Sequence, residues 1–496
     1  MTPVLVSTIT GALSAAGLVV ETRGDLPLSV AAITDDSRQA ARGALFVAVR
    51  GAERDGHEFL EAAAAAGATL AIVEDPARTT LPAIVVKDAR RAAARAAAAF
   101  FGEPARGMRL IAVTGTNGKT TTVGMLRHVL DAEGARAASI GTLGVLVGSE
   151  GAPFPGGGGL TTPGPVELQR LLRALADSSV RTIAMEASSH ALTQHRVDGV
   201  RFRVALFTNF TRDHLDYHGT MAAYFAAKAS LLGHLEPDGV AVRNADEPAW
   251  RKLENAPRWM SFGERAKDAD VTATDVRFTA RGSTWTLGAF GASHPVRLPF
   301  IGDFNVANAL GAAAAACAVG LDLGTIATRL STMPQVPGRL EILSERPAVL
   351  RDYAHTPDAL ARALSALRPV TPGALILVFG AGGDRDRGKR PLMADVADRL
   401  ADRIVVTSDN PRTEDPERII DEIVAKLAAT RYERIEDRRA AIARAITIAD
   451  PAKDIVLLAG KGHETYQVRG TERIPFDERV VVRELLRARE SAGGRS

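Results

Sequence analysis

Glycines, a lysine and threonines are spaced through Gly115–Thr121 in a pattern that suits phosphate chemistry. The segment follows the apolar run Leu110–Val113 and precedes a helical pattern over 122–131, so a strand, a tight loop and a helix are predicted. In such a loop the backbone N–H groups and the helix N-terminus point at an anion. Lys119 would neutralise phosphate charge, and the Thr120 hydroxyl would bind Mg²⁺.

This loop resembles a Walker A loop in a shortened form, because Val113 stands where the general pattern has a glycine. An ordinary glycine-containing turn between a strand and a helix is the alternative. An acidic residue follows another predicted strand, because the apolar run Thr182–Met185 ends at Glu186. A carboxylate at a strand end beside a phosphate loop is well placed to bind Mg²⁺.

Several segments, in this order along the chain, resemble those of the Mur ligases and their folylpolyglutamate synthetase relatives. The segments that carry the resemblance are Gly115–Thr120, Met185–His190, Asn209–His218, Tyr224–Lys228, Gly302–Asn308, Pro337–Leu340 and Asp352–Pro357. The resemblance covers nearly all of the chain, and the part before residue 107 matches least distinctly.

The resemblance implies two Mg²⁺ ions and an unusual lysine. Thr120 and Glu186 would hold one ion, and His214 and Lys228 the other. Lys228 would carry a carbamate formed with carbon dioxide, which converts a cationic amine into an anionic oxygen ligand. Together with Lys119, the residues Glu186, His214 and Lys228 are the predicted catalytic set. The alternatives are a solvated strand-end acid, a structural histidine and a solvated helical lysine.

The nucleotide in this family is ATP. Asn305 is expected near the adenine, Arg339 is expected to reach the nucleotide from a hinge, and Asp352 is expected near the ribose or phosphate. Asparagine often caps a helix and arginine often forms surface pairs, so these three are weaker when taken singly. The predicted ATP-binding residues are Gly115, Thr116, Asn117, Gly118, Lys119, Thr120, Thr121, Asn305, Arg339 and Asp352.

A UDP-sugar peptide is the second ligand that the resemblance implies. The box Thr34–Arg38 is similar to one that contacts uridine, with Ser37 as the contact. Hydroxyl and amide groups suit the peptide part, and Arg196 can pair with a carboxylate or phosphate through its planar fork. The alternatives are an Asx or Ser turn at Ser37 and a helix cap at the threonines. The predicted residues are Ser37, Thr161, Thr162, Ser188, Gln194 and Arg196.

The incoming amino acid is expected to be meso-diaminopimelate, because Asp409–Arg412 matches the sequence in Mur ligases that add it. Arg412 offers a forked contact for the distal carboxylate of diaminopimelate, whereas the distal ammonium of lysine would be repelled. Glu464 would hold the distal ammonium, and Gly460 would supply a backbone contact. A surface turn around Pro411 with incidental charges is the alternative. The predicted residues are Arg385, Asp409, Asn410, Pro411, Arg412, Gly460 and Glu464.

These residues need an α/β framework, and 496 residues are too many for a single core. Proline and glycine mark junctions near 104–107 and 333–338. We expect a UDP-sugar-binding domain over 1–107, a central ATP-binding domain with a P-loop ATPase-like parallel sheet over 108–335, and a Rossmann-like amino-acid-binding domain over 336–496. The third domain would close on the second.

Composition and charge argue against some classes of protein. With 61 basic and 58 acidic residues, a net charge of +3 and no long basic run, nothing indicates nucleic acid. No apolar run reaches the roughly 20 residues of a membrane-spanning helix. The first twenty residues lack a basic leader and read as folded protein. A cytoplasmic protein without membrane insertion, and a monomer, are expected.

The resemblance therefore implies an ATP-dependent, ADP-forming ligase of peptidoglycan synthesis, with a role in cell shape and division. It would add meso-diaminopimelate to the D-glutamate of UDP-MurNAc-L-Ala-D-Glu through an acyl phosphate. An L-lysine-adding homologue and a folylpolyglutamate-type synthetase are the alternatives. A nucleotide-binding regulator without catalysis could dispense with Glu186, His214 and Lys228, which are all present.

Overall fold

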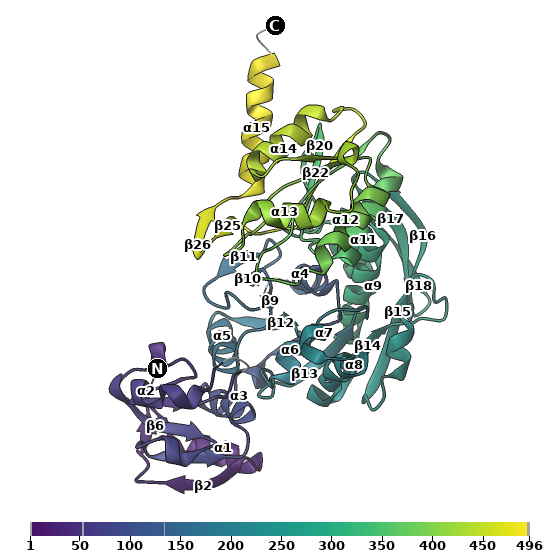
Figure 1. Cartoon of the computed structure of the whole chain (residues 1–496). Helices are drawn as coiled ribbons and strands as arrows, with labels where there is room; N and C mark the ends of the chain where they lie inside the picture. Colours follow the sequence, from purple (N-terminus) through teal and green to yellow (C-terminus); the bar gives the residue numbers. More distant parts are fainter. Residues whose placement is uncertain (1, 52–53, 133, 494–496) are drawn as a thin grey trace. The chain divides into compact units, whose positions relative to one another are not determined.

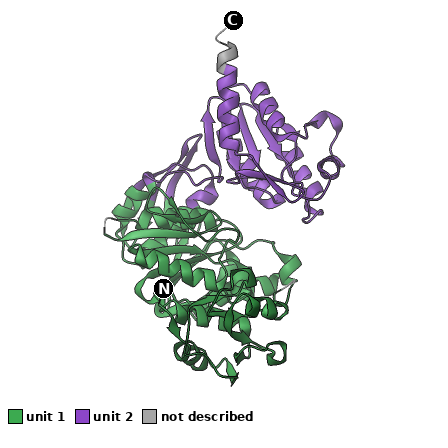
Figure 2. Ribbon diagram, turned by 90° about the vertical axis from the view of Figure 1, so that its left-hand side faces the viewer, with its two compact units in different colours: residues 1–273, 287–294, 307–330 green, residues 274–286, 295–306, 331–496 purple. Residues whose placement is uncertain are grey.

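The computed structural model describes residues 2–51, 54–132 and 134–493 of the chain. They form two compact units, which are coloured separately in Figure 2. Unit 1 comprises residues 1–273, 287–294 and 307–330, and unit 2 comprises residues 274–286, 295–306 and 331–496.

Unit 1 begins with a small sheet of order β2-β7-β6-β5-β4, in which β2 is antiparallel and the others run parallel. Its strands are β2 (Val19–Arg23), β4 (Ala32–Thr34), β5 (Ala44–Val47), β6 (Ala68–Val73) and β7 (Ala83–Val86), with a short pair β1 (Val4–Leu5) and β3 (Ser29–Val30) beside it. The helices are α1 (Val6–Ala15), α2 (Leu60–Ala65) and α3 (Ala89–Phe100). Strand β5 is buried on both faces, because α1 and α3 pack on one side and α2 on the other.

The second sheet of unit 1 has the order β11-β10-β9-β12-β8-β13-β14-β15. Its strands are β8 (Arg109–Thr114), β9 (Arg136–Gly141), β10 (Gly144–Val147), β11 (Ala152–Phe154), β12 (Val180–Glu186), β13 (Phe202–Phe207), β14 (Leu235–Asn244) and β15 (Arg258–Gly263). Strands β9, β12, β8, β13, β14 and β15 run parallel, and β10 and β11 are antiparallel additions at one edge. The nearly continuous apolar sequence of β8 follows from its central position.

Helices cover both faces of this sheet, as Figure 1 shows. They are α4 (Lys119–Leu130), α5 (Pro165–Asp177), α6 (Ser189–Thr193), α7 (Leu215–His218), α8 (Met221–Ala229), α9 (Asp303–Ala318) and α10 (Leu323–Ser331). Leucines of α5 enter the core on one face. The alanine-rich α9 approaches β13 and β15 closely, because a Cβ on Gly311 would contact Phe262 and Leu206. The sheet order continues through β16 (Val271–Thr279), β17 (Gly282–Ala289) and β18 (Ala292–Leu298), whose residues are divided between the two units.

Unit 2 is built on a sheet of order β19-β20-β24-β21-β22-β23, parallel except for β19. Its strands are β19 (Glu341–Glu345), β20 (Ala348–Asp352), β21 (Leu375–Phe379), β22 (Arg403–Val406), β23 (Tyr432–Arg434) and β24 (Ile455–Ala459), followed by the hairpin β25 (Tyr466–Arg469) and β26 (Glu472–Pro475). Helices α11 (Pro357–Leu367), α12 (Lys389–Leu400) and α13 (Pro416–Val424) pack on one face, and α14 (Arg438–Ile448) and α15 (Glu478–Gly493) on the other.

Parallel strands gather the predicted site residues at their carboxyl ends, where ligands of open α/β sheets bind. In unit 1, β8 leads into the phosphate loop, and the neighbouring β12 ends at Glu186, which is paired in register with Val113. In unit 2, Asp352 ends β20 and is paired with Ala459 at the end of β24. The loops that follow β21, β22 and β24 leave the same edge of the sheet.

The α/β class and the predicted central strands are confirmed. The runs Leu110–Val113, Thr182–Met185 and Leu375–Phe379 form β8, β12 and β21. Strand β9, the antiparallel strands β10 and β11, and the strands between 235 and 298 were not predicted individually. Among the described residues, no helix is long and apolar enough to cross a membrane.

Candidate active site

The phosphate loop between β8 and α4 has a backbone that only glycine adopts readily. Gly115 has a φ of 146° and Gly118 a φ of 85°, both in the region that side chains disfavour. A Cβ on Gly115 would overlap the Oγ1 atom of Thr208, and a Cβ on Gly118 would overlap Oδ1 of Asn308. The two glycines are therefore required by conformation and by close packing.

The segment after β13 fixes this loop. The backbone N–H of Thr116 donates to the carbonyl of Asn209 at 2.9 Å, and the N–H of Asn117 donates to Asn209 Oδ1 at 2.9 Å. Thr208 Oγ1 donates to the carbonyl of Asn117 at 2.7 Å. No role was predicted for Thr208, Asn209 or Asn308, although Asn209 and Asn308 stand inside the motif segments and Thr208 directly precedes one of them.

Replacing Gly115 with alanine is expected to weaken nucleotide binding at least about 10-fold, because the φ and the overlap with Thr208 each cost of order 1–3 kcal/mol. Titration with an ATP analogue measures this. Gly11→Ala in helix α1 is the control, since a Cβ there meets no atom within 4 Å. Equal affinities of the two variants would contradict a shaped phosphate loop.

Two lysines converge on the same carbonyl group. The Nζ atoms of Lys119 and Lys228 donate to the Gly115 oxygen at 2.9 Å and 2.7 Å. Lys228, on α8, is 1% exposed and lies over the ring of Tyr224. Burial, and then the charge of Lys119, lower the pKa of Lys228 well below its ordinary value. A buried lysine with a lowered pKa has more neutral, nucleophilic amine at pH 7 than an exposed one.

His214 lies in a cluster of imidazole and phenol rings. Its ring centroid is 4.8 Å from that of His190 and 6.1 Å from that of Tyr224, and His190 also contacts Tyr217 and His218. Burial, followed by the neighbouring His214 and His218, lowers the pKa of His190 to about 4. His190 is therefore neutral near pH 7. His190 belongs to the motif Met185–His190, and no separate role was predicted for it.

Glu186 is 1% exposed, and its carboxylate is oriented by one residue. Its Oε1 accepts the backbone N–H of Thr142 at 2.8 Å, and its Oε2 accepts the Thr142 hydroxyl at 3.3 Å. A Cβ on Gly141 would overlap Oε1, so the glycine leaves room for the acid. The predicted metal-binding hydroxyl of Thr120 and carboxylate of Glu186 are oxygen donors that suit Mg²⁺, whereas the imidazole of His214 is a donor more typical of transition metals.

The predicted UDP-dipeptide residues of this sheet form one hydrogen-bonded network. Thr162 Oγ1 donates to the Glu186 carbonyl at 2.8 Å and accepts the N–H of Ser188 at 3.1 Å. Arg196 donates to the Thr162 carbonyl at 2.8 Å and, through Nη2, to Gln194 Oε1 at 2.6 Å. The hydroxyls of Thr161 and Thr142 are 3.2 Å apart, which joins Thr161 to the same network.

The Ser37 box belongs to this region of unit 1. Ser37 begins a 3-10 turn that Asp36 caps by accepting the N–H of Arg38. The preceding Asp35 has a raised pKa, chiefly through burial, and the positive charge of Arg196 opposes that rise. The Asp35 carboxylate is therefore close enough to the Arg196 guanidinium for their opposite charges to attract each other.

The three remaining predicted ATP contacts belong to unit 2, and each has local contacts. Asn305 Nδ2 donates to the Ile301 carbonyl at 2.8 Å. Asp352 accepts the N–H groups of Leu340 and Ala354 at 2.7 Å and 2.8 Å. Burial raises the pKa of Asp352, and the nearby charge of Arg339 opposes this. Asp352 thus fixes the turn that carries Arg339.

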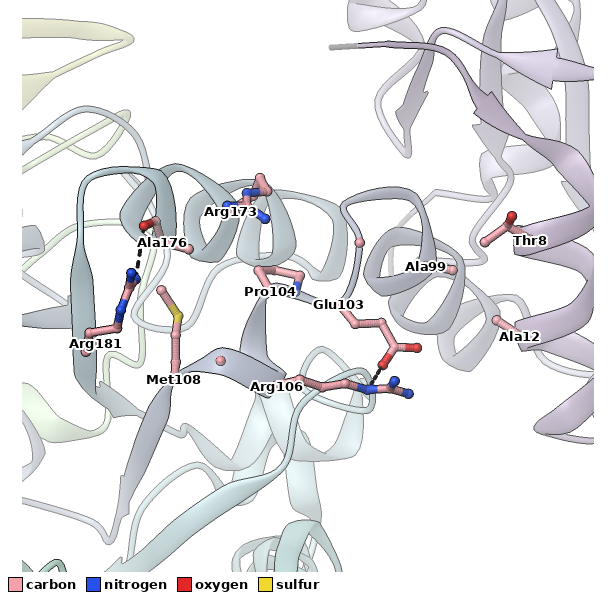
Figure 3. Close-up of a pocket in the computed structure, with 12 residues that line it drawn as sticks. Thr8, Ala12, Ala99, Glu103, Pro104, Arg106, Met108, Arg173, Ala176 and Arg181 are labelled. Atoms are coloured by element: carbon pink, nitrogen blue, oxygen red, sulfur yellow. Dashed lines mark hydrogen bonds and ion pairs between the residues drawn. The ribbon is translucent and has the colours of Figure 1, made fainter.

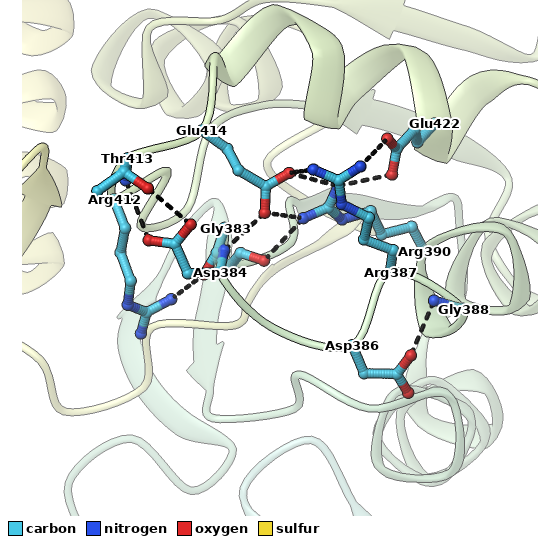
Figure 4. A network of polar contacts seen from close by, with 11 residues as sticks. Gly383, Asp384, Asp386, Arg387, Gly388, Arg390, Arg412, Thr413, Glu414 and Glu422 are labelled. Atoms are coloured by element: carbon cyan, nitrogen blue, oxygen red, sulfur yellow. Dashed lines mark hydrogen bonds and ion pairs between the residues drawn. The ribbon is translucent and has the colours of Figure 1, made fainter. Parts of the chain in front are cut away.

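Two predicted arginines of unit 2 lie near Gly382. A Cβ on Gly382 would lie 2.9 Å from Arg412 Nη1 and 3.8 Å from Arg385 Cγ. Arg412 has a φ of 53° and donates to the Gly383 carbonyl at 2.7 Å, as Figure 4 shows. Among the described residues, neither guanidinium forms an ion pair with an acid. A guanidinium without an acidic partner can accept an anionic ligand group such as a carboxylate.

The other arginines of these loops are paired. Figure 4 shows Arg387 and the fully buried Arg390 on Glu414 and Glu422. The hydrogen bond from Arg390 is the main reason that the pKa of Glu414 falls to about 2. Glu414 also accepts the N–H of Asp384 at 2.6 Å. This network ties the loop after β21 to the loop after β22.

The two loops also interlock through their backbones. The N–H of Gly383 donates to the Asn410 carbonyl at 2.9 Å, and a Cβ on Gly383 would overlap the Pro411 carbonyl. On the β24 side, a Cβ on Gly460 would overlap Oδ2 of Asp409. Asn410 Nδ2 donates to Glu464 Oε2 at 2.8 Å. The structure therefore brings the predicted diaminopimelate-binding residues together at one edge of the sheet.

A pocket of about 690 Å³ elsewhere in unit 1 has none of the predicted residues in its lining. Figure 3 shows it near the ends of α1, α3 and α5. Its Arg106 pairs with Glu103, and its Arg181 donates to the Ala176 carbonyl at 3.2 Å. Among the described residues, no group of three or more His, Cys, Asp or Glu side chains could hold a metal ion.

Comparison with known proteins gives three family matches along the chain. The Mur ligase family catalytic domain matches residues 29–109, the Mur ligase middle domain matches 113–316, and the Mur ligase glutamate ligase domain matches 338–462. A UDP-N-acetylmuramoyl-L-alanyl-D-glutamate–2,6-diaminopimelate ligase from Synechococcus elongatus is 44% identical over 484 residues, which are 94% of this chain and 96% of that protein.

Solved structures agree on the fold. The structure of a UDP-N-acetylmuramoyl-L-alanyl-D-glutamate–2,6-diaminopimelate ligase is 33% identical, with a TM-score of 0.69, and covers 99% of this chain and 100% of that one. A folylpolyglutamate synthase from Mycobacterium tuberculosis is 21% identical, with a TM-score of 0.63, and covers 75% of this chain and 92% of that one. The second likeness bears on the fold alone.

Proposed function

Because this chain belongs to the Mur ligase family, we propose that it joins meso-diaminopimelate to the D-glutamate of UDP-MurNAc-L-Ala-D-Glu. It is an ATP-dependent, ADP-forming ligase of peptidoglycan precursor synthesis. The observation that supports this amino acid is the pair of arginines near Gly382, Arg385 and Arg412, which have no acidic partner among the described residues. A distal carboxylate fits that pair, and the distal ammonium of lysine does not.

The reaction has two steps. The γ-phosphoryl group of ATP moves to the γ-carboxylate of the D-glutamyl residue, which forms an acyl phosphate and releases ADP. The amine of diaminopimelate then attacks the acyl carbon, so an amide bond forms and inorganic phosphate and a proton leave. The loop amides and Lys119 hold the phosphates, and Thr162, Ser188 and Arg196 hold the peptide substrate.

Two Mg²⁺ ions would be held by Thr120, Glu186, His214 and the carbamate of Lys228, and they would neutralise phosphate charge. Carbamylation joins the Lys228 nitrogen to the carbon of CO₂ with loss of a proton. The burial of Lys228 and its lowered pKa support this, since the neutral amine is the form that reacts. Asn305, Arg339 and Asp352 complete the proposed ATP site, and Ser37 the proposed uridine site.

The proposal is tested by measuring ADP release from ATP in the presence of UDP-MurNAc-L-Ala-D-Glu. ADP and the tripeptide product should form together only when diaminopimelate is added, and L-lysine should give a rate lower by at least about 30-fold. Equal rates with lysine would favour the lysine-adding alternative. No turnover with any amino acid would indicate a nucleotide-binding regulator.

We propose domains at 1–107, 108–335 and 336–496, a cytoplasmic location, a monomer without membrane insertion, and a role in cell shape and division. A folylpolyglutamate-type activity is disfavoured because the similarity to that structure covers 75% of the chain, against 99% for the diaminopimelate ligase.

A further inference from the structure

Lys461 is a completely buried lysine to which the reaction described above assigns no task. It lies in the loop directly after β24 and has 0% exposure. Its Nζ donates to Asn410 Oδ1 at 3.0 Å and to Glu464 Oε2 at 3.2 Å. A buried ammonium is costly unless charged and polar partners surround it, so these two contacts must offset its desolvation.

The contact with Lys461 sets the orientation of the Asn410 amide. Oδ1 of Asn410 accepts from Lys461 and also from the backbone N–H of Val468 at 2.9 Å. Both partners are donors without acceptor capacity, so a flipped amide would place its NH₂ group against two donors. The Nδ2 group is therefore directed at Glu464, to which it donates at 2.8 Å.

Glu464 is held through one of its two oxygens. The hydrogen bonds from Asn410 and Lys461 both end on Oε2. Within the described part of the chain, Oε1 has no hydrogen-bond partner. The Glu464 side chain is 17% exposed, so its carboxylate lies at the boundary between the interior and the site. One oxygen is thus anchored, and the other can accept a donor from a ligand.

We propose that Lys461 is a positioning residue that orients Glu464 Oε1 toward the distal ammonium of the incoming amino acid. This inference rests on the proposed function and extends it. Lys461 holds both the Asn410 amide and Oε2 of Glu464 in place. The Glu464 carboxylate therefore keeps Oε2 toward the interior and Oε1 toward the site. Selectivity for a second amino group then depends on a lysine that does not contact the ligand.

The test compares meso-diaminopimelate with 2-aminopimelate, which keeps the distal carboxylate and lacks the distal ammonium. For each enzyme, the ratio of kcat/KM for the two amino acids is measured. Lys461→Met and Glu464→Gln should lower the preference for diaminopimelate to similar values, at least about 10-fold below that of the unmodified protein. Lys453→Met, at an exposed lysine, is the matched control and should keep the ratio.

A purely structural ion pair would lower kcat/KM for both amino acids equally in Lys461→Met, and that result would overturn the inference. An unchanged ratio in Glu464→Gln would do the same. If Lys461→Met does not fold, Lys461→Ser gives the same readout, because its short side chain reaches neither Asn410 nor Glu464 and leaves room for water. Failure of the unmodified protein to use diaminopimelate would instead overturn the proposed function, and the inference with it.

Discussion

Replacing Lys228 with alanine is expected to lower kcat at least about 100-fold, the largest loss among the single substitutions considered. The side chain is buried, donates to the Gly115 carbonyl and supplies the proposed carbamate oxygens. Alanine removes a metal ligand and leaves a cavity beside the phosphate loop. A short carboxylate such as formate or acetate can enter that cavity and supply the missing oxygens, so part of the activity should return.

The measurement is steady-state ADP release with increasing concentrations of the added acid. Chloride at equal ionic strength is the control for a general salt effect. Removal of CO₂ and bicarbonate should also lower the activity of the unmodified protein, and bicarbonate should restore it. Full activity of Lys228→Ala without any additive would be incompatible with a carbamate at this position.

Arg412→Ala is expected to raise the KM for diaminopimelate about 30-fold or more, and to leave the KM values for ATP and the UDP-dipeptide within about 2-fold. Truncating one partner of a buried charged pair typically costs about 2–5 kcal/mol, mainly because the other charge is left unpaired. Lysine lacks the distal carboxylate, so its already poor use should not fall further. The preference between the two amino acids therefore collapses.

Steady-state kinetics with each substrate varied in turn tests this prediction. Arg387→Ala is the matched control, because Arg387 is an exposed arginine of the same loop pair whose guanidinium is paired with Glu414 and Glu422. Its KM for diaminopimelate should stay within about 3-fold of the original value. An equal rise for all three substrates in Arg412→Ala would refute the assignment.

The parts of the fold that could be predicted from sequence are those with a strong local signal. The runs that form β8 and β21 are apolar along their whole length, because helices cover both faces of a parallel strand. The glycines of the phosphate loop stand where the backbone has a positive φ, which residues with a side chain rarely adopt, so they indicate that conformation from the sequence alone. The antiparallel strands β10 and β11 at the sheet edge are only four and three residues long and are partly exposed, so no comparable pattern marked them.

Contacts between distant segments could not be predicted from local patterns. Asn308 lies beside Gly118 although 190 residues separate them, and Thr208 fills the space above Gly115. Lys461 stands between Gly460 and Glu464 in the sequence, yet its burial and its bonds to Asn410 follow only from the order of β24, β21 and β22 in the sheet. A lysine in a glycine-rich loop otherwise reads as a solvated charge.

The close approach of Gly383 to the Pro411 carbonyl bears on how amino-acid choice can change during evolution or by engineering. The loop after β21 cannot be replaced while the original loop after β22 is kept, because any side chain at position 383 would collide with the Pro411 carbonyl. The loops after β21, β22 and β24 should therefore be transferred to another protein together, as one unit. The strands beneath contribute buried apolar residues to the core and none of the predicted ligand contacts, so a graft of all three loops should retain the host's folding stability.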